Sequence, residues 1–288
     1  MIRYNPKEWF SLIFEFHKSD TLRKMIYVLL IYGFYSLAIV YVESDYIKFQ
    51  STISIHSLVG FVLGLLLVFR TNTAYERWWE GRKLLGALVN TSRNLALKVD
   101  AFLPIEASAK REFFARMISN YCFSMKNHLR DKRIASELVL SNDLTEDKFN
   151  SIDHLPNLIA EKIYGATKNM YNEKTITDNI YITLDDQVKE FTDIIGGCER
   201  IKKTPIPYSY NIFIKKIIFI YTMTLPIGLA TTFEYWAIPI SLFVLYILVS
   251  LELLAEEIED PFGEDTNDLP VDEICHTIKK NVEEILMK

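Results

Sequence analysis

The sequence predicts an all-α membrane protein with four transmembrane helices in two hairpins and a cytoplasmic helical block. Half of its 288 residues are hydrophobic and 13% are aromatic. Its apolar runs form two closely spaced pairs, at residues 25–42 and 53–69 and at residues 212–233 and 235–254. About 20 apolar residues cover a bilayer core of roughly 30 Å. Because 24% of the residues are charged, a sizeable part of the chain must also face water.

The first pair of spans follows an amphipathic segment. Residues 1–24 mix aromatic and aliphatic side chains with basic ones, which is typical of a helix lying along a membrane surface. Lys and Arg are frequent before the first span and after the second, whereas the loop between the spans contains only Lys48. The positive-inside rule therefore predicts that both ends of this hairpin, and with them the chain termini, lie in the cytoplasm.

The span at residues 53–69 carries the most distinctive pattern. Phe61, Leu65 and Phe69 recur at a spacing of four, so on a helix they would form one apolar stripe about 12 Å long. Spacing alone favours packing of this stripe against neighbouring helices. The single imidazole of this span, His56, is expected to be a hydrogen-bonded helix residue. Directly after the span the sequence becomes basic and aromatic, as at a membrane surface, with Arg70, Arg77, Trp78 and Trp79.

Residues 70–211 are predicted to form the cytoplasmic helices. Helical periodicity is visible over residues 75–99 and 111–139. The second of these segments has a stripe expected to face a core, made of Phe113, Phe114, Met117, Ile118, Tyr121 and Met125. Residues 141–157 are expected to form a loop with a turn at Pro156. Helical patterns then continue to Gly196 and Gly197, and the prolines on both sides of Ile206 exclude a regular helix there.

The second hairpin comprises residues 212–233 and 235–254, separated by Glu234. Its first span contains Pro226 and Gly228, which predict a kink accommodated by neighbouring helices. The acidic tail, residues 255–288, is expected to join the cytoplasmic block.

Several classes of function are disfavoured. A net charge of −5 lacks the basic footprint of a nucleic-acid-binding protein. Cys122, Cys198 and Cys275 are far apart and form no CxxC pair, so they predict buried thiols and neither a zinc site nor a disulfide framework. The spans have no acidic or arginine residue deep inside them, and no motif of a hydrolase or phosphate-binding enzyme occurs. The sequence therefore predicts no enzyme, no cofactor and no metal site, and the N-terminus does not resemble a signal peptide.

A set of short motifs spread over the chain carries a resemblance. They are Phe61-Val62-Leu63-Gly64, Phe69-Arg70-Thr71-Asn72, Arg77-Trp78-Trp79-Glu80 with Arg82 and Lys83, Thr204-Pro205-Ile206-Pro207, and Asp260-Pro261-Phe262-Gly263. Together they resemble the bestrophin family, particularly its bacterial branch, over essentially the whole chain as one domain.

The resemblance implies a homopentameric, multi-pass ion channel of the cell membrane that passes small monovalent ions. Phe61, Leu65 and Phe69 match the positions of a hydrophobic pore neck, and Ile206 matches a constriction at the cytosolic exit. Family breadth favours chloride and other anions. A sodium-selective channel of the same fold, a membrane scaffold without ion flux and a transporter remain alternatives.

The acidic segment after Gly263 departs from the family's calcium-binding pattern. Asp265 and Asp268 match acidic positions of that pattern, but the residues between them are Thr266 and Asn267. Calcium needs six to eight oxygen ligands, so we expect a solvated acidic loop here.

Overall fold

A computed structural model describes residues 20–46, 48, 50–104, 106–141 and 144–287. Of the surface segment expected over residues 1–24, residues 1–19 lie outside the described part, and residues 20–24 already belong to the first long helix. The described residues form helices and no strand. The chain divides into two compact units. Of the described residues, the span unit comprises residues 20–77 and 205–259, and the block unit comprises residues 78–204 and 260–287. Each is described separately below.

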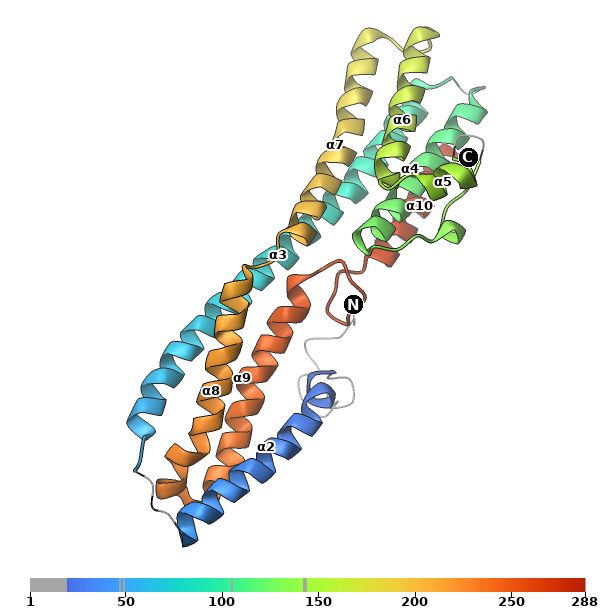
Figure 1. Ribbon diagram of the computed structural model, residues 1–288. Helices are drawn as coiled ribbons and strands as arrows, with labels where there is room; N and C mark the ends of the chain where they lie inside the picture. Colours follow the sequence, from blue (N-terminus) through green and yellow to red (C-terminus); the bar gives the residue numbers. More distant parts are fainter. Residues whose placement is uncertain (1–19, 47, 49, 105, 142–143, 288) are drawn as a thin grey trace. The chain divides into compact units, whose positions relative to one another are not determined.

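The span unit contains the apolar helices of the molecule. They are α2 (Asp20–Asp45), the first half of α3 (Ile53–Phe102), α8 (Tyr208–Phe233), the short η2 (Glu234–Trp236) and α9 (Ala237–Glu259). Helices α2, α8 and α9 pack against one another (Figure 1). Three described stretches are long and apolar enough to cross a membrane, Thr21–Asp45, Ile53–Phe102 and Tyr208–Glu259. The third reverses direction around η2, where Glu234 has a φ of 48°, so it contains two helices of membrane-spanning length.

Helix α3 differs from the expected arrangement of a span and a separate cytoplasmic helix. It continues without a break through 50 residues. No proline or glycine lies between Arg70 and Glu80, so nothing in this segment interrupts the backbone hydrogen bonds. The hydroxyl groups of Thr71 and Thr73 donate to the carbonyl groups of Leu67 and Phe69, one turn earlier. The hydrogen-bonding needs of these two hydroxyl groups are therefore met within the helix. The boundary between the two units therefore falls within one helix.

Helices α3 and α8 are in contact within the span unit through apolar side chains. Leu63 and Leu67 of α3 share an apolar cluster with Ile214 and Ile218 of α8. Near the start of α3, the Nε2 atom of His56 lies 3.1 Å from the hydroxyl of Thr224, and its Nδ1 atom lies 3.1 Å from that of Thr52, which confirms a hydrogen-bonded histidine.

Helix α8 tolerates both of its helix-disrupting residues. A Cβ atom on Gly228 would lie 2.6 Å from the Thr52 hydroxyl, so only glycine permits this close approach. The helix continues through the buried Pro226 up to Phe233.

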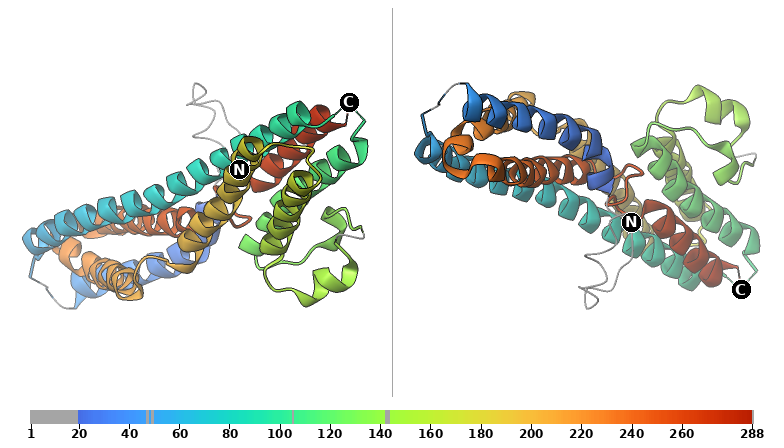
Figure 2. Two further views of the ribbon diagram at one scale, coloured as in Figure 1. Left: turned by 90° about the horizontal axis from the view of Figure 1, so that it is seen from above. Right: turned by 90° about the horizontal axis from the view of Figure 1, so that it is seen from below.

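The block unit is built around a larger apolar core. Its helices are the second half of α3, α4 (Ser108–Leu129), η1 (Ala135–Glu137), α5 (Glu146–Ser151), α6 (Leu155–Asn172), α7 (Asp178–Lys203) and α10 (Val271–Leu286). Helix α4 packs against α6, α7 and α10, and α6 runs beside α7 (Figure 2). The predicted core stripe of α4 is confirmed, with Phe113 at its edge and the other five side chains buried. Cys122, Cys198 and Cys275 are buried free thiols, as expected.

Three boundaries in the block unit were predicted wrongly. The helix expected over residues 111–139 ends at Leu129, and Asp131 follows with a left-handed φ of 52°. The expected loop at residues 141–157 contains the short helix α5. Pro156 lies in the first turn of α6, where backbone N–H groups make no hydrogen bond within the helix, so proline is tolerated there. Helix α7 continues through Gly196 and Gly197 and ends at Lys203.

The start of α10 carries a carboxylate that should make the block unit sensitive to acid. Asp272 accepts hydrogen bonds from Lys126 at 2.9 Å and from Arg130 at 2.8 Å. Burial raises the pKa of Asp272, but these two cationic donors outweigh burial and hold the pKa below its ordinary value. The folded protein therefore gains stability from the ionised form above the unfolded-state pKa of about 3.9, and loses it as the pH falls through the lower folded-state pKa.

We expect Asp272→Asn to lower the melting temperature at pH 6, and the difference from the unmodified protein to shrink as the pH is lowered below about 4. Thermal unfolding between these conditions measures this difference directly. Asp186→Asn, at an exposed position of α7, is the matched control and should show little difference at either pH. A constant difference for Asp272→Asn across the range would contradict the proposed ion-pair origin.

Candidate functional site

The predicted neck residues lie on an uncovered face of α3. The side chains of Phe61, Leu65 and Phe69 are 73%, 49% and 56% exposed. The residues of α3 that are buried in the same segment are Leu63, Leu67, Arg70 and Ala74. At 100° per residue this buried set lies on nearly the opposite side of the helix from the three predicted neck residues. The span unit thus uses one face of α3 for its own packing and leaves the neck face open.

The uncovered apolar surface is wider than the predicted stripe. Leu58, Val62 and Val68 of α3 are also exposed. Helix α2 exposes further large apolar side chains, among them Tyr27, Ile31 and Phe34. Contiguous apolar surface of this extent is not left facing water in stable proteins. Lipid or other copies of the chain must therefore cover these faces.

The turn before α8 holds the residue predicted for the cytosolic constriction. The backbone N–H of Ile206 donates to Oε1 of Glu259 at 2.8 Å. Pro205 and Pro207 have no N–H group, so this is the one backbone donor of the Pro-Ile-Pro segment, and it ties the turn to the end of α9. The Ile206 side chain is only 7% exposed in the single chain. A residue that forms a constriction would be expected to project further from its own chain.

A buried charged cluster lies next to the neck face. Arg70, which directly follows Phe69, is 1% exposed. Its Nη2 atom donates to Oε2 of Glu259 at 2.8 Å, and its Nε atom lies 3.5 Å from Oε2 of Glu252. Arg77 donates from Nε to the backbone carbonyl of Glu259 at 3.1 Å. Helix α3, helix α9 and the Ile206 turn are therefore joined through one glutamate.

The acidic half of this cluster was not predicted from the sequence. Arg70 was expected at a membrane border and Glu259 in the acidic tail, and Glu252 had no predicted role. The available signal was that Glu252 interrupts an apolar run, because a carboxylate in such a position needs a cationic partner. The pairing itself depends on the packing of α3 against α9 and leaves no local pattern.

Four motif residues of the block unit, Trp78, Pro261, Phe262 and Gly263, belong to or contact the loop between α9 and α10. Trp78 donates from Nε1 to the carbonyl of Asn267 at 3.0 Å, and Arg130 donates from Nε to the carbonyl of the buried Phe262 at 3.0 Å. Pro261 is also buried, and its carbonyl accepts from the backbone N–H of Leu269 at 2.9 Å. These residues hold the loop in place.

Three further motif residues take no part in this loop. Trp79 and Glu80 belong to the block unit, and Asn72 belongs to the span unit. Glu80 accepts from Arg200 at 2.6 Å. Trp79 is exposed, and so is Asn72 in the span unit. None of these three contributes to the predicted neck stripe.

The acidic segment after Gly263 is organised by its own backbone. Oδ2 of Asp268 accepts from the backbone N–H of Asp265 at 2.7 Å. A Cβ atom on Gly263 would lie 2.6 Å from the same oxygen, which explains why glycine occupies this position. Asp268 is buried and Asp265 is exposed, so the two carboxylates face different surroundings.

Comparisons with known proteins agree with this arrangement. The family described as bacterial/fungal bestrophin protein matches residues 1–284. A voltage-dependent anion channel-forming protein of Synechocystis is 32% identical over 286 residues, which are 98% of this chain and 93% of that protein. The Escherichia coli protein YneE, also named a voltage-dependent anion channel-forming protein, is 32% identical over 289 residues, or 97% of this chain and 92% of YneE.

The fold is likewise similar to a solved structure. A crystal structure of a variant of a bacterial bestrophin homolog from Klebsiella pneumoniae matches with a TM-score of 0.85 and 27% identity, covering 92% of this chain and 100% of that one. The family match spans nearly the entire sequence, and the helical fold agrees with it. The chain therefore belongs to the bestrophin family.

Proposed function

We propose that this protein is an anion channel of the cell membrane in which five copies surround one pore and the first half of α3 lines a hydrophobic neck. The observation that carries the proposal is the open apolar face of Phe61, Leu65 and Phe69 on a helix whose other face is already packed. Five copies of that face would form three stacked apolar collars. Such collars can close a pore by excluding water.

The proposed topology has four crossings of the membrane. Helix α2, the first half of α3, α8 and α9 are each apolar and of sufficient length. The distribution of Lys and Arg favours a cytoplasmic location for both termini and for the block unit. No enzymatic step is part of this proposal, and the protein's partners are further copies of itself, the lipid bilayer and the permeant ions.

The preference for anions rests on the relatives. Two relatives of nearly the same length are named voltage-dependent anion channel-forming proteins. The proposed collars contain no charged side chain, so they offer no ring that would favour a cation. A sodium-selective channel of the same fold is the alternative that selectivity measurements must distinguish.

Reconstitution of the purified protein into liposomes tests whether the protein conducts ions at all. We expect chloride efflux from protein-containing vesicles, and a mass of five chains per particle from light scattering of the detergent-solubilised protein. The absence of any ion flux would favour the membrane scaffold. Saturable, slow and substrate-coupled flux would favour a transporter, and a conducting monomer would contradict the ring.

Ile206 remains our candidate for the cytosolic constriction. Because little of its side chain is exposed, we expect its effect on permeating ions to be small. We expect Ile206→Ala to change permeability ratios among monovalent anions, because the side chain lies on a proline-flanked turn fixed to Glu259. Ile159→Ala, at a buried position of α6, is the matched control and should affect stability alone. Bi-ionic reversal potentials of both variants provide the measurement. Identical ratios in both variants and in the unmodified channel would remove Ile206 from the permeation pathway.

A further inference from the structure

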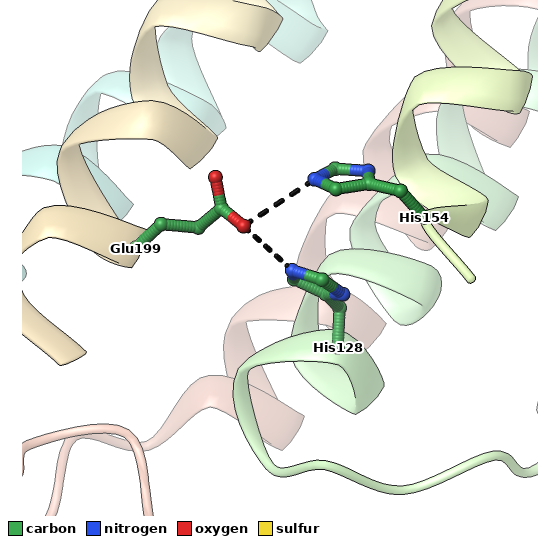
Figure 3. Close-up of side chains that lie close together, drawn as sticks. All are labelled: His128, His154 and Glu199. Atoms are coloured by element: carbon green, nitrogen blue, oxygen red, sulfur yellow. Dashed lines mark hydrogen bonds and ion pairs between the residues drawn. The ribbon is translucent and has the colours of Figure 1, made fainter. Parts of the chain in front are cut away.

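Three side chains far apart in sequence converge in the block unit. His128 lies in the last turn of α4, His154 is the N-cap of α6, and Glu199 lies on α7. Figure 3 shows both imidazole rings directed at the same carboxylate oxygen. The Nε2 atom of His128 lies 2.8 Å from Oε1 of Glu199, and that of His154 lies 3.4 Å from it. One ligand atom from each residue lies within 4.8 Å of the other two.

These distances are close to those of a metal site. Zinc binds imidazole nitrogen at about 2.0–2.1 Å, so neighbouring ligand atoms in a tetrahedral site are roughly 3.3 Å apart. The His154–Glu199 separation already matches this value. The His128–Glu199 separation would have to open by about half an ångström, which a small rotation of two side chains provides. Two histidines and one glutamate also form a ligand set that binds zinc with one position left for water.

The three side chains are accessible from solvent. All three side chains are partly exposed. A cavity of about 280 Å³ borders His128 and Asp153, the residue before His154.

Three existing contacts compete with an ion. The hydrogen bond from Nε2 of His128 to Oε1 of Glu199 would be replaced by the ion. The Lys203 ammonium lies 3.0 Å from Oε1 of Glu199, but its side chain is 68% exposed and can swing into solvent. The Nδ1 atom of His154 accepts the backbone N–H of Asn157 at 3.2 Å. A metal on Nε2 would place the imidazole proton on Nδ1, so this cap bond would be lost. All three losses weaken binding, and each can be made by a proton shift or a side-chain rotation.

We propose that His128, His154 and Glu199 bind one divalent transition-metal ion of the zinc class and thereby cross-link α4, α6 and α7. Nitrogen supplies two of the three ligands, which disfavours calcium and magnesium because both prefer oxygen. All three ligands belong to the block unit, and the proposal does not depend on ion selectivity. Its direct consequence is a more stable block unit in the presence of the ion.

The full-length protein, stripped with EDTA in detergent, should bind one Zn²⁺ per subunit in a calorimetric titration with ZnCl₂, and MgCl₂ should give no comparable binding. A hundredfold excess of free zinc over its Kd should raise the melting temperature by roughly 5–10 °C. Anomalous scattering from a zinc-soaked crystal should place the ion between the three ligand atoms. Failure of the unmodified protein to bind zinc, or an ion located elsewhere, would overturn the proposal.

Matched variants separate metal binding from a purely structural cluster. His154→Asn keeps a favoured N-cap residue while removing the imidazole, and it should lower zinc affinity at least about tenfold, as should Glu199→Gln. His276→Asn, at an exposed position of α10, should bind as the unmodified protein does. Lys203→Gln should bind zinc more tightly, because it removes the competing cation. Unchanged affinity in His154→Asn, or weaker binding in Lys203→Gln, would contradict the assignment.

Discussion

Leu65→Ala, alone or together with Phe61→Ala and Phe69→Ala, is expected to raise the open probability or the conductance of the channel several-fold. A narrow apolar tube gives an ion no replacement for its hydration shell. Truncating the collars widens the tube and lowers this barrier without adding charge. Selectivity should change much less than current, because the substitution removes no charged group.

Leu67→Ala is the matched control for this experiment. Leu67 is two residues from Leu65 but is 2% exposed and packs against α8. Its truncation should destabilise the protein by about 2–5 kcal/mol and leave current per assembled channel unchanged. Single-channel recording and thermal unfolding of the assembled protein together distinguish the two residues. If Leu65→Ala instead lowered stability and left currents unchanged, Leu65 would be a packing residue between helices and the proposed gate would be wrong.

Arg70→Leu is expected to destabilise the protein by about 3–5 kcal/mol, because it leaves the carboxylates of Glu252 and Glu259 buried without their cation. This corresponds to a fall in melting temperature of roughly 10 °C. Arg70→Lys should recover only part of the loss, since a single ammonium cannot reproduce the fork of guanidinium donors. Arg200→Leu breaks an exposed ion pair with Glu80 and should have an effect below about 1 kcal/mol.

Two substitutions of Glu259 separate its charge from its contact with the Ile206 turn. Glu259→Gln retains an acceptor for the Ile206 N–H and leaves Arg70 with one carboxylate partner, so we expect a mild effect. Glu259→Ala removes the acceptor as well, and should be more destabilising and alter conduction. Thermal unfolding and recordings in planar bilayers measure both effects. Equal behaviour of the two variants would show that the contact with the turn has no role.

The features predicted correctly from the sequence depend on local patterns. The apolar runs, the core stripe of α4, the break at Ile206 and the reversal at Glu234 follow from residues close together in the chain. The errors at helix ends have the same origin. Helix α3 continues past Phe69 because the following segment contains no residue that breaks a helix, although its composition changes abruptly. Pro156 was assigned to a turn, although proline is equally suited to the first turn of a helix.

The charged contacts could not be predicted in this way. Arg70 meets Glu252 and Glu259 only because α3 packs against α9. His128, His154 and Glu199 come together only when α4, α6 and α7 form one core. Single histidines and glutamates on separate helices have no distinguishing spacing. The burial of Ile206 could not be predicted either, because it results from the packing of other segments around the turn.

The central claim is that the protein conducts anions through an apolar neck. The reversal potential of the purified protein in a planar bilayer, under a sodium chloride gradient, tests this claim most directly. We predict a reversal potential close to the equilibrium potential of chloride, with the same value in Leu65→Ala at higher current. A reversal potential close to the equilibrium potential of sodium would contradict the claim.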